Sequence, residues 1–348
     1  MRDLSRLPKA HLHLHFTGSL RVSSLLELAE ARGARLPGSL IGAEALQVPA
    51  DQRGWFRFQR QYDIARSVVK GEDAVRRVVR EAAMDDAAEG SRRLEIQVEP
   101  SSYARELGGL TPALEVMLDE AKLASRDTGV EVGVIVAASR IRHPLDARTL
   151  ARLAARYAGD GAGEVVGFGL SNDERKGDTS EWAGAFAIAR RAGLPAMPHG
   201  GELLGPEHLR DVVAHLHPDR VGHGVRGAEE PDLIRRMADD GISFEVCPAS
   251  NVALGVFQEE DEVPLRRMFD LGARIALGAD DPLLFRSRLV DQYEIARSQG
   301  FTDAELAELA RHSVRASTAS DSTKSSILVG IDAWLAEPDD GSAWTRDE

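Results

Sequence analysis

The stretch His11-Leu12-His13-Leu14-His15, close to the start of the chain, holds three of the ten histidines within five residues. Imidazoles alternate with apolar side chains along it, and this period of two predicts a β-strand with all three imidazoles on one face. Imidazoles two residues apart at a strand end can share one metal ion. The alternative is a half-buried strand whose histidines are polar residues facing water.

The composition bounds the class of protein. The chain has 348 residues, of which 43% are hydrophobic and 28% charged, as is usual for a globular protein with a large core. A net charge of −13 and the lack of a basic tract argue against nucleic acid or an anionic membrane as a partner. The single cysteine, Cys247, excludes an internal disulfide and a cysteine-rich zinc site. With no apolar signal core or spanning run, we expect a cytoplasmic protein, and the sequence leaves its oligomeric state open.

Strand and helix patterns alternate along most of the chain. Repeated βα units with parallel strands predict an α/β fold, the (β/α)8 TIM-type barrel. After the histidine strand, the expected strands are 94–98, 131–138, 164–170, 194–198, 219–222, 242–246 and 273–278. The expected helices between them are 111–128, 145–158, 180–192, 205–216, 229–240 and 264–271.

Two regions depart from the simple repeat. Residues 20–90 read as a helical insertion after the first strand, either a lid over a site or a segment whose aromatic residues are helix core. Extra C-terminal helices are expected at 287–298, 302–312 and 324–335, with 317–326 as a polar connector. We therefore expect one barrel domain over 1–336 and an acidic tail over 337–348.

Polar residues follow five of the expected strands. The C-terminal ends of barrel strands converge on one face, where barrel enzymes carry their chemistry. A lone histidine at a strand end is more often packed or solvent-facing than a ligand, but five polar ends together predict a metal-dependent catalytic site. The residues concerned are His13 and His15, His199-Gly-Gly-Glu202, His223, Cys247-Pro-Ala-Ser-Asn251 and Asp280-Asp281-Pro282.

The donor types suggest the metal. Three neutral imidazoles, from His13, His15 and His199, and one carboxylate, from Asp280, suit a single zinc ion with an open position for water. Bound zinc lowers the pKa of such a water to about 7.

The remaining polar residues have candidate roles beside the metal. Glu202 can shuttle protons, and His223 can orient the attacking hydroxide or take its proton. Asp281 can hydrogen-bond the water or the substrate, or it can be the N-cap of the helix that starts at Pro282. Cys247 is expected to be structural.

In order and spacing, five motifs resemble the adenosine deaminase family of the amidohydrolase superfamily. The resemblance implies zinc held by His13, His15, His199 and Asp280, and Glu202 as the acid that protonates purine N1. It also implies hydrolytic release of ammonia from C6 of adenosine or a related 6-aminopurine nucleoside. The motifs are Leu7-Pro-Lys-Ala-His-Leu-His-Leu-His15, His199-Gly-Gly-Glu202, Gly222-His-Gly224, Cys247-Pro-Ala-Ser-Asn251 and Asp280-Asp-Pro282.

Three positions depart from the family pattern. Thr17, followed by Gly18, stands where the family usually has a carboxylate that binds a sugar hydroxyl. Asn172 replaces a glycine whose backbone amide faces purine N3, and His11 replaces a glutamate. The expected substrate contacts are thus His15, Thr17, Gly18, Asn172 and Asp281, and the altered ones suggest a shifted substrate.

Three alternatives remain open at this point. In the first, the substrate is free adenine or a 5′-modified adenine nucleoside. In the second, the barrel hydrolyses a different amine or amide, and in the third the chain is a binding protein without activity. The binding-protein alternative lacks support, because Glu202 and all the residues expected to ligate the metal are present in the sequence. A two-metal relative would carry a lysine in the fourth strand, and the run 164–174 has none.

Overall fold

A computed structural model describes residues 1–338, so most of the expected acidic tail, 337–348, lies outside the described residues. Eight strands form one sheet in chain order, and every neighbouring pair is parallel. A bridge between Leu14 and Asp280 brings the first strand to the end of the last one. The strands are β1 (Lys9–His15), β2 (Ser91–Val98), β3 (Glu131–Ser139), β4 (Val165–Ser171), β5 (Ala196–Gly200), β6 (Arg220–His223), β7 (Ser243–Val246) and β8 (Arg274–Leu277).

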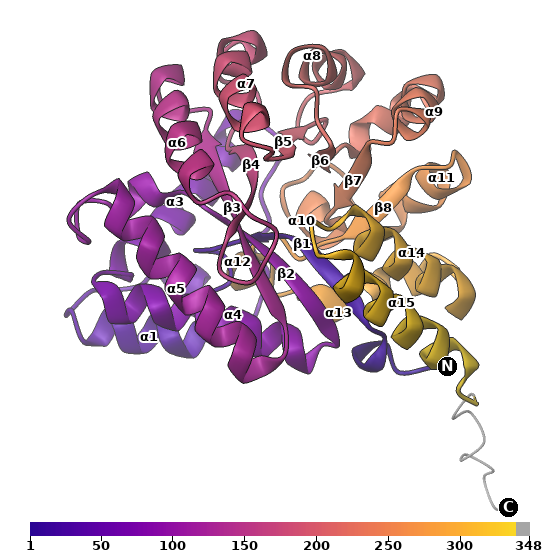
Figure 1. Cartoon of the computed structure of the whole chain (residues 1–348), viewed down its shortest axis with the longest axis horizontal. Coiled ribbons are helices and arrows are strands. Elements are labelled where there is room, and N and C mark those ends of the chain that lie inside the picture. The colour runs from indigo at the N-terminus through magenta and orange to yellow at the C-terminus, as the bar shows by residue number, and fades with distance from the viewer. Residues whose placement is uncertain (339–348) are drawn as a thin grey trace, which may run out of the picture.

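Helices surround these strands, as Figure 1 shows, and the architecture is the expected α/β TIM-like barrel. Apolar side chains on the outer face of the strands pack against the helices in two large clusters. The helices between successive strands are α5 (Leu110–Thr128), α6 (Pro144–Arg156), α7 (Ala183–Arg191), α8 (Pro206–Leu216), α9 (Pro231–Asp239), α10 (Pro248–Ala253) and α11 (Leu265–Asp270). Short 3₁₀ helices are η1 (Leu4–Arg6), η2 (Pro100–Ser102), η3 (Thr179–Trp182), η4 (Val225–Glu229) and η5 (Glu260–Glu262).

The segment between β1 and β2 is helical, as expected. It contains α1 (Val22–Glu30), α2 (Gly38–Ile41), α3 (Gln52–Val68) and α4 (Glu72–Ala88). Asp51 caps α3, because its side chain accepts a hydrogen bond from the backbone N–H of Gly54. This segment supplies one wall of the pocket described below.

After β8 the chain forms α12 (Pro282–Phe285), α13 (Leu289–Ser298), α14 (Asp303–Ala316) and α15 (Asp321–Ala336). The expected polar connector 317–326 is wrong in its second half, because α15 already begins at Asp321 with Ser320 as its N-cap. Serine and threonine favour caps and turns, but the helix continues here because its buried face, with Ile327 and Ile331, packs on the barrel.

The inner face of the barrel is charged in its lower layer. Alternation along β2 turns Leu94, Ile96 and Val98 outward into the core, and leaves Arg93 and Glu95 on the opposite face. Both of these side chains are fully buried and pair with each other. Bulky branched residues usually fill this layer in barrels of this kind.

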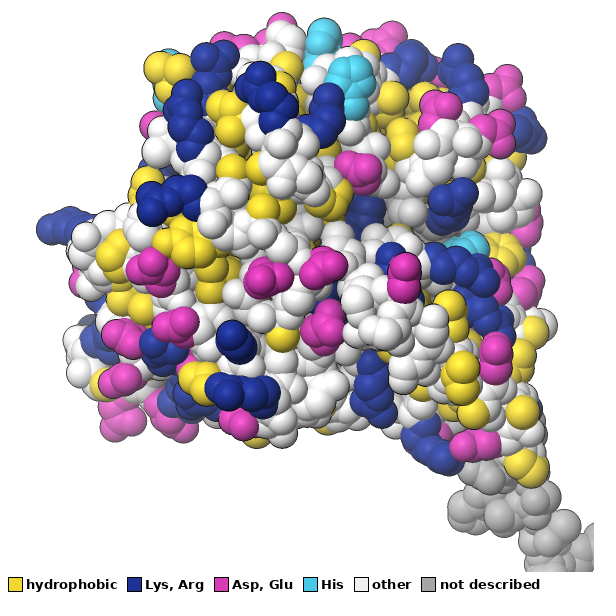
Figure 2. All heavy atoms as spheres, in the orientation of Figure 1, with side chains coloured by type: hydrophobic (Ala, Val, Ile, Leu, Met, Phe, Trp, Pro, Cys, Tyr) yellow, Lys and Arg dark blue, Asp and Glu magenta, His cyan; other side chains and the backbone are white. Residues whose placement is uncertain are grey.

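The surface carries charges of both signs. On the face drawn in Figure 2, Lys and Arg side chains are interspersed with Asp and Glu, and no basic stripe runs across it. Among residues 1–338, no helix combines the length and apolar character that crossing a membrane requires.

Candidate active site

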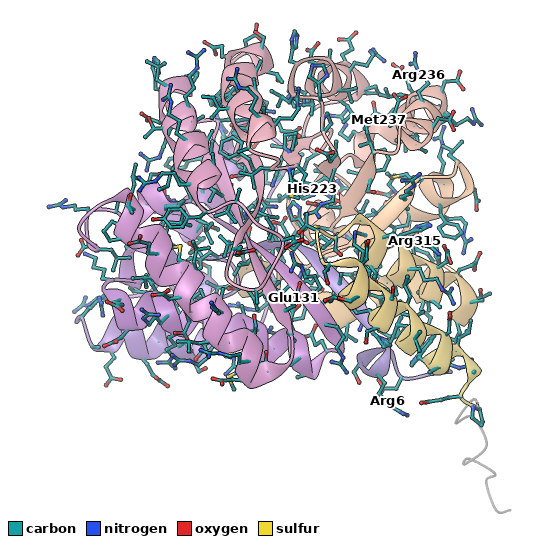
Figure 3. All side chains as sticks on the ribbon, viewed as in Figure 1. Arg6, Glu131, His223, Arg236, Met237 and Arg315 are labelled. Atoms are coloured by element: carbon teal, nitrogen blue, oxygen red, sulfur yellow. The ribbon has the colours of Figure 1, made fainter. Side chains whose placement is uncertain are left out.

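The expected metal donors converge in the structure. His13 and His15 come from β1, His199 from β5, and Asp280 follows β8. The imidazole centroids of the three histidines lie 4.8–5.2 Å apart. Asp280 Oδ1 lies 3.2 Å from His15 Nε2 and 3.7 Å from His13 Nε2. Figure 3 shows His223, which adjoins this cluster, near the centre of the molecule.

The donor set fits a zinc ion. The Nε2 atoms of His13 and His199 are buried without a hydrogen-bond partner among the described residues, which is costly unless a ligand or ion uses them. With four protein donors and a water, zinc bonds of about 2.0–2.2 Å at angles of about 90–120° separate neighbouring ligand atoms by roughly 2.8–3.8 Å. The donor spacings of 3.2 and 3.7 Å lie within that range.

Neighbouring side chains orient two of the donors. Glu245 of β7 lies 2.7 Å from Nδ1 of His13, so Nδ1–H donates to the carboxylate and leaves the Nε2 lone pair for the site. Ser250 donates to Asp280 Oδ2 at 2.6 Å, so Oδ1, which lies 3.2 Å from His15 Nε2, is the oxygen that faces the other donors. Sequence reasoning missed both contacts; the signal for Glu245 was a charged residue inside the apolar strand 242–246.

Close packing of the donors requires two glycines. A Cβ on Gly222 would come within 2.9 Å of both His13 and His199, and a Cβ on Gly278 would lie 2.6 Å from His13 Cβ. These small residues therefore let β6 and β8 approach the imidazoles. Strain also gathers here, since Asn172, His223 and Asp280 all have positive φ angles of 60–79°.

Burial sets the charge of the site. It lowers the pKa of His199 well below its usual range and that of His223 to about 3, so both imidazoles are neutral. Burial raises the pKa of Asp280, but the hydrogen bond from His15 and nearby imidazoles outweigh it and keep this carboxyl ionised. Burial and the neighbouring charge of Glu174 raise the pKa of Glu202 well above its usual range, which favours a neutral carboxylic acid.

Glu202 and His223 face one another across the site, with His223 Nε2 3.7 Å from Glu202 Oε1. Glu174 fixes the turn that carries Glu202, because its carboxylate accepts hydrogen bonds from the backbone N–H groups of residues 202–204. Asn251 Nδ2 lies 3.4 Å from His223 Nδ1. Because the amide N–H donates to Nδ1, the proton of the His223 ring is on Nε2, the nitrogen that faces the proposed metal ligands.

Asp281 occupies the N-cap position of α12, but its side chain makes no capping hydrogen bond. Its Oδ1 is buried without a partner among the described residues, and the side chain lines the pocket. The helix-cap alternative therefore explains the backbone position and leaves the carboxylate available to a ligand. Gly18 packs directly on this carboxylate, since a Cβ there would lie 1.8 Å from Oδ1.

His11 does not join the other histidines. The register between β1 and β2 shifts between His11 and Leu14, so the simple alternation breaks at this point. His11 Nε2 accepts a hydrogen bond from the N–H of Ala279, and Nδ1 pairs with Asp86 of α4 at 2.9 Å. The expectation that all three imidazoles share one face was wrong for His11.

Cys247 lies closer to the donors than the sequence suggested. Its Sγ is within 4.8 Å of ligand atoms of His223 and Asp280. Burial raises the pKa of this thiol well above its usual range. A neutral thiol is a poor zinc ligand, which agrees with a structural role for Cys247.

A pocket opens above the donors. One wall is α3, with Trp55, Phe58, Gln59 and Tyr62, so the aromatic residues of this helix serve the pocket as well as the core. Thr17 lines the same pocket, buried, with its hydroxyl 2.6 Å from the hydroxyl of Tyr103.

Asn172 joins two walls of the pocket. Its side-chain amide donates to Gln59 Oε1 at 3.1 Å, which links the end of β4 to α3. Its φ of 79° is one that asparagine tolerates better than most residues with a side chain, and this explains how it replaces a glycine.

Comparison with known proteins identifies a family and several similar proteins. The family described as adenosine deaminase matches residues 8–334. A Streptomyces virginiae protein named "Putative adenosine/adenine deaminase" is 60% identical over 96% of this chain and 98% of its own length. An adenine deaminase from Sinorhizobium medicae is 34% identical over 94% of this chain and 99% of its own length.

Two solved structures are similar over nearly the whole chain. The crystal structure of an adenine deaminase from Arthrobacter aurescens has a TM-score of 0.86 and 27% identity, covering 95% of this chain and 99% of that one. An amidohydrolase from Burkholderia ambifaria with bound zinc has a TM-score of 0.80 and 25% identity, covering 96% and 94%.

Proposed function

The chain belongs to the adenosine deaminase family, and from this premise we propose that it hydrolyses the 6-amino group of adenosine or a related adenine nucleoside, with one zinc ion per chain. It is a hydrolase acting on C–N bonds of cyclic amidines. The observation that carries the proposal is a buried Glu202, with a raised pKa, at the base of a pocket where the Nε2 atoms of His13, His199 and His223 have no hydrogen-bond partner among the described residues.

In this proposal His13, His15, His199 and Asp280 hold the zinc. When bound, zinc lowers the pKa of a coordinated water and so supplies a nucleophile at neutral pH. Glu245 and Ser250 prepare the donors by orienting His13 and Asp280. Glu245 thus fixes the tautomer of His13 before the ion arrives.

Glu202 is the general acid. As a neutral carboxylic acid it donates its proton to ring N1, which withdraws electrons from C6 as the nucleophile adds. His223, neutral and with its proton on Nε2, holds the attacking oxygen on the correct face of the ring. Burial and the neighbouring Asp280 raise the pKa of Asp281 well above its usual range, and its carboxyl group hydrogen-bonds the water or the base. Gly18 packs against this carboxyl group.

The lining of the pocket supports a nucleoside. Besides the metal donors and Thr17, it includes the polar residues Arg66, Glu99 and Ser102, and Arg66 contacts both of the other two. These groups would lie beside the sugar and its 5′ carbon.

Free adenine is the second candidate, because relatives at 32–34% identity are named adenine deaminases. A substrate panel of adenosine, adenine and adenosines substituted at the 5′ carbon, followed by ammonia release, separates the candidates. We expect the nucleosides to have the higher kcat/KM. Turnover of adenine alone would replace the nucleoside proposal by the adenine one, and no ammonia from any of them would refute both.

A variant of Thr17 tests how the pocket recognises the sugar of the nucleoside. Its hydroxyl faces Tyr103, and it supplies a neutral partner where a carboxylate would bind a sugar hydroxyl more strongly. Thr17→Asp should raise kcat/KM for adenosine relative to 5′-substituted analogues, by up to about tenfold. An unchanged ratio would mean that Thr17 does not set this preference, and plain adenosine would then be the substrate to favour.

A further inference from the structure

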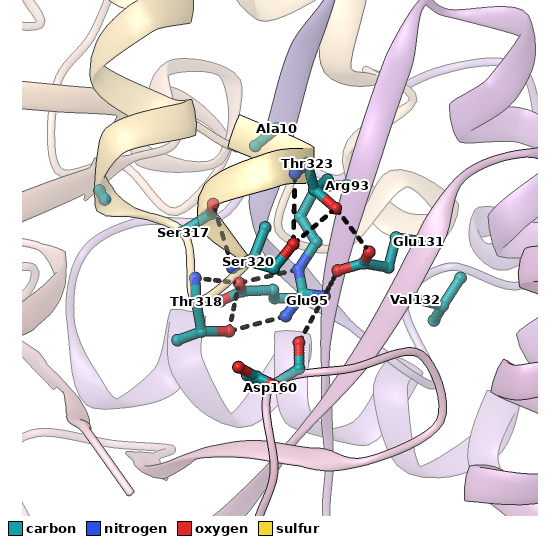
Figure 4. Close-up of polar contacts among 12 residues, drawn as sticks. Ala10, Arg93, Glu95, Glu131, Val132, Asp160, Ser317, Thr318, Ser320 and Thr323 are labelled. Carbon is teal, nitrogen blue, oxygen red and sulfur yellow. Dashed lines mark hydrogen bonds and ion pairs between the residues drawn. The ribbon is translucent and has the colours of Figure 1, made fainter. Parts of the chain in front are cut away.

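A polar segment from the C-terminal region covers the end of the barrel opposite the proposed metal ligands. It is Ser317-Thr318-Ala319-Ser320, between α14 and α15, and Ser317 and Ala319 are both buried. Thr318 donates to Glu95 Oε1 from its hydroxyl and from its backbone N–H, each at 2.7 Å. Figure 4 shows this contact, with Arg93 also donating to the Thr318 hydroxyl at 2.7 Å.

The contacts continue from Glu95 to the metal donors. The other oxygen of Glu95 forms an ion pair with Arg220 Nη1 at 2.6 Å. Arg220 Nε donates to Glu245 Oε1 at 2.6 Å, and Glu245 Oε2 accepts from Nδ1 of His13 at 2.7 Å. An uninterrupted series of short polar contacts therefore joins Thr318 to a proposed zinc ligand.

These groups have little freedom to adjust independently. The side chains of Arg93, Glu95, Arg220 and Glu245 are at most 3% exposed. Their formal charges balance, and a buried charge that loses a partner is strongly destabilising, so each member holds the next in place. Each carboxylate uses its two oxygens for different partners, and a rotation of Glu95 would displace Arg220 and then Glu245.

We propose that Thr318 is a positioning residue for zinc, acting through Glu95, Arg220 and Glu245 to set the orientation of His13. The proposal rests on the zinc site of the proposed function. Carboxylates that orient a ligating histidine typically change metal affinity by about 10–100-fold when they are disturbed. The segment after α14 would therefore control how tightly the opposite end of the barrel holds its ion.

The competing explanation is that the segment only stabilises the fold. Thr323 offers a matched control, because its hydroxyl also donates to a carboxylate, that of the half-buried Glu131, at 3.0 Å. Glu131 pairs with Arg93 and has no contact with Arg220 or Glu245 among the described residues. Thr318→Val and Thr323→Val thus each remove one hydroxyl. The Thr318 hydroxyl contacts Glu95, which is in the series of contacts that leads to His13, and the Thr323 hydroxyl contacts Glu131, which is not.

The experiment uses full-length protein, loaded with zinc and titrated with a chelator of known affinity. We expect Thr318→Val to raise the zinc dissociation constant by about tenfold. Thr318→Ser, which keeps the hydroxyl, should stay within about twofold of the wild type. Thr323→Val should leave the dissociation constant unchanged, whatever it does to thermal stability. The visible spectrum of cobalt-substituted protein should change only for Thr318→Val.

Several outcomes overturn the proposal. An unchanged zinc affinity in Thr318→Val, or equal losses in both valine variants, would leave the segment a purely structural role. Glu95→Gln gives a second reading, with a loss of at least tenfold expected; if that variant does not fold, the two threonine variants decide alone. A wild type that holds no zinc would refute the proposed function and this inference together, whereas tight zinc in all variants refutes the inference only.

Discussion

At the scale of single residues, Glu202 makes the strongest prediction. Glu202→Gln keeps the size and hydrogen-bonding capacity of the side chain but cannot give a proton to ring N1. We expect kcat to fall by about 10²–10⁴-fold, as is typical for the loss of a general acid. Zinc content, measured by metal analysis, should remain that of the wild type. A glutamine variant with near-normal turnover would remove Glu202 from the mechanism.

The pH profile tests the environment of the same residue. Glu202 acts in its protonated form, and its pKa is raised first by burial and then by the charge of Glu174. Activity should therefore be lost as the pH rises through that raised pKa. Glu174→Gln removes a negative charge, lowers the pKa of Glu202, and should move the alkaline limb of kcat/KM to lower pH. Glu207→Gln, on the exposed side of α8, is the control and should leave the limb in place.

The role of His13, His15, His199 and Asp280 as zinc ligands stays a prediction. These four residues were predictable as one cluster, because the C-terminal ends of barrel strands converge on one face. Glu245, Arg220 and Glu95 were not, because a charged residue in an apolar strand shows its partner only when the strands close around it. His11 was misplaced because the shift in register of β1 leaves no mark in the alternating pattern.

At the scale of elements, α3 is the part of the insertion that meets the substrate pocket. Gln59 of α3 and Asn172 after β4 connect its two walls through one hydrogen bond of 3.1 Å. Gln59→Ala should raise KM by about two- to tenfold with little change in kcat, since a neutral hydrogen bond contributes about 0.5–1.5 kcal/mol. Gln61→Ala, on the same helix but bonded to Ser39, should leave KM unaltered. Equal effects of the two variants would show that the helix as a whole matters and the bond does not.

Element boundaries show where pattern reasoning ends. Strand 131–138 was expected almost as it is, because it is a continuous apolar run, as buried parallel strands often are. Strand 94–98 was predictable from its alternation, but β2 begins earlier, at Ser91. The composition of the polar run 317–326 is that of a loop and predicts a connector. Helix α15 nevertheless begins at Asp321, because Ser320 caps it and its buried face packs against the barrel, and neither contact can be predicted from composition.

At the scale of the whole molecule, zinc should stabilise the fold. The proposed donors come from β1, β5 and the end of β8, so the ion joins distant parts of the chain and binds the folded state alone. Free zinc at 100 times its dissociation constant should add about 2.7 kcal/mol to the free energy of unfolding. Thermal unfolding with and without a chelator measures this difference. An equal melting temperature in both conditions would contradict a tightly held metal in the native protein.

The contact between Leu14 and Asp280 also has a consequence for biosynthesis. A ribosome makes the histidines of the first strand well before the aspartate that completes the proposed donor set, which follows β8. A growing chain therefore carries imidazoles before the carboxylate that would join them. Under the proposed function, zinc binding and closure of the barrel coincide, so a chain that stops before residue 280 should hold zinc more weakly than the full chain.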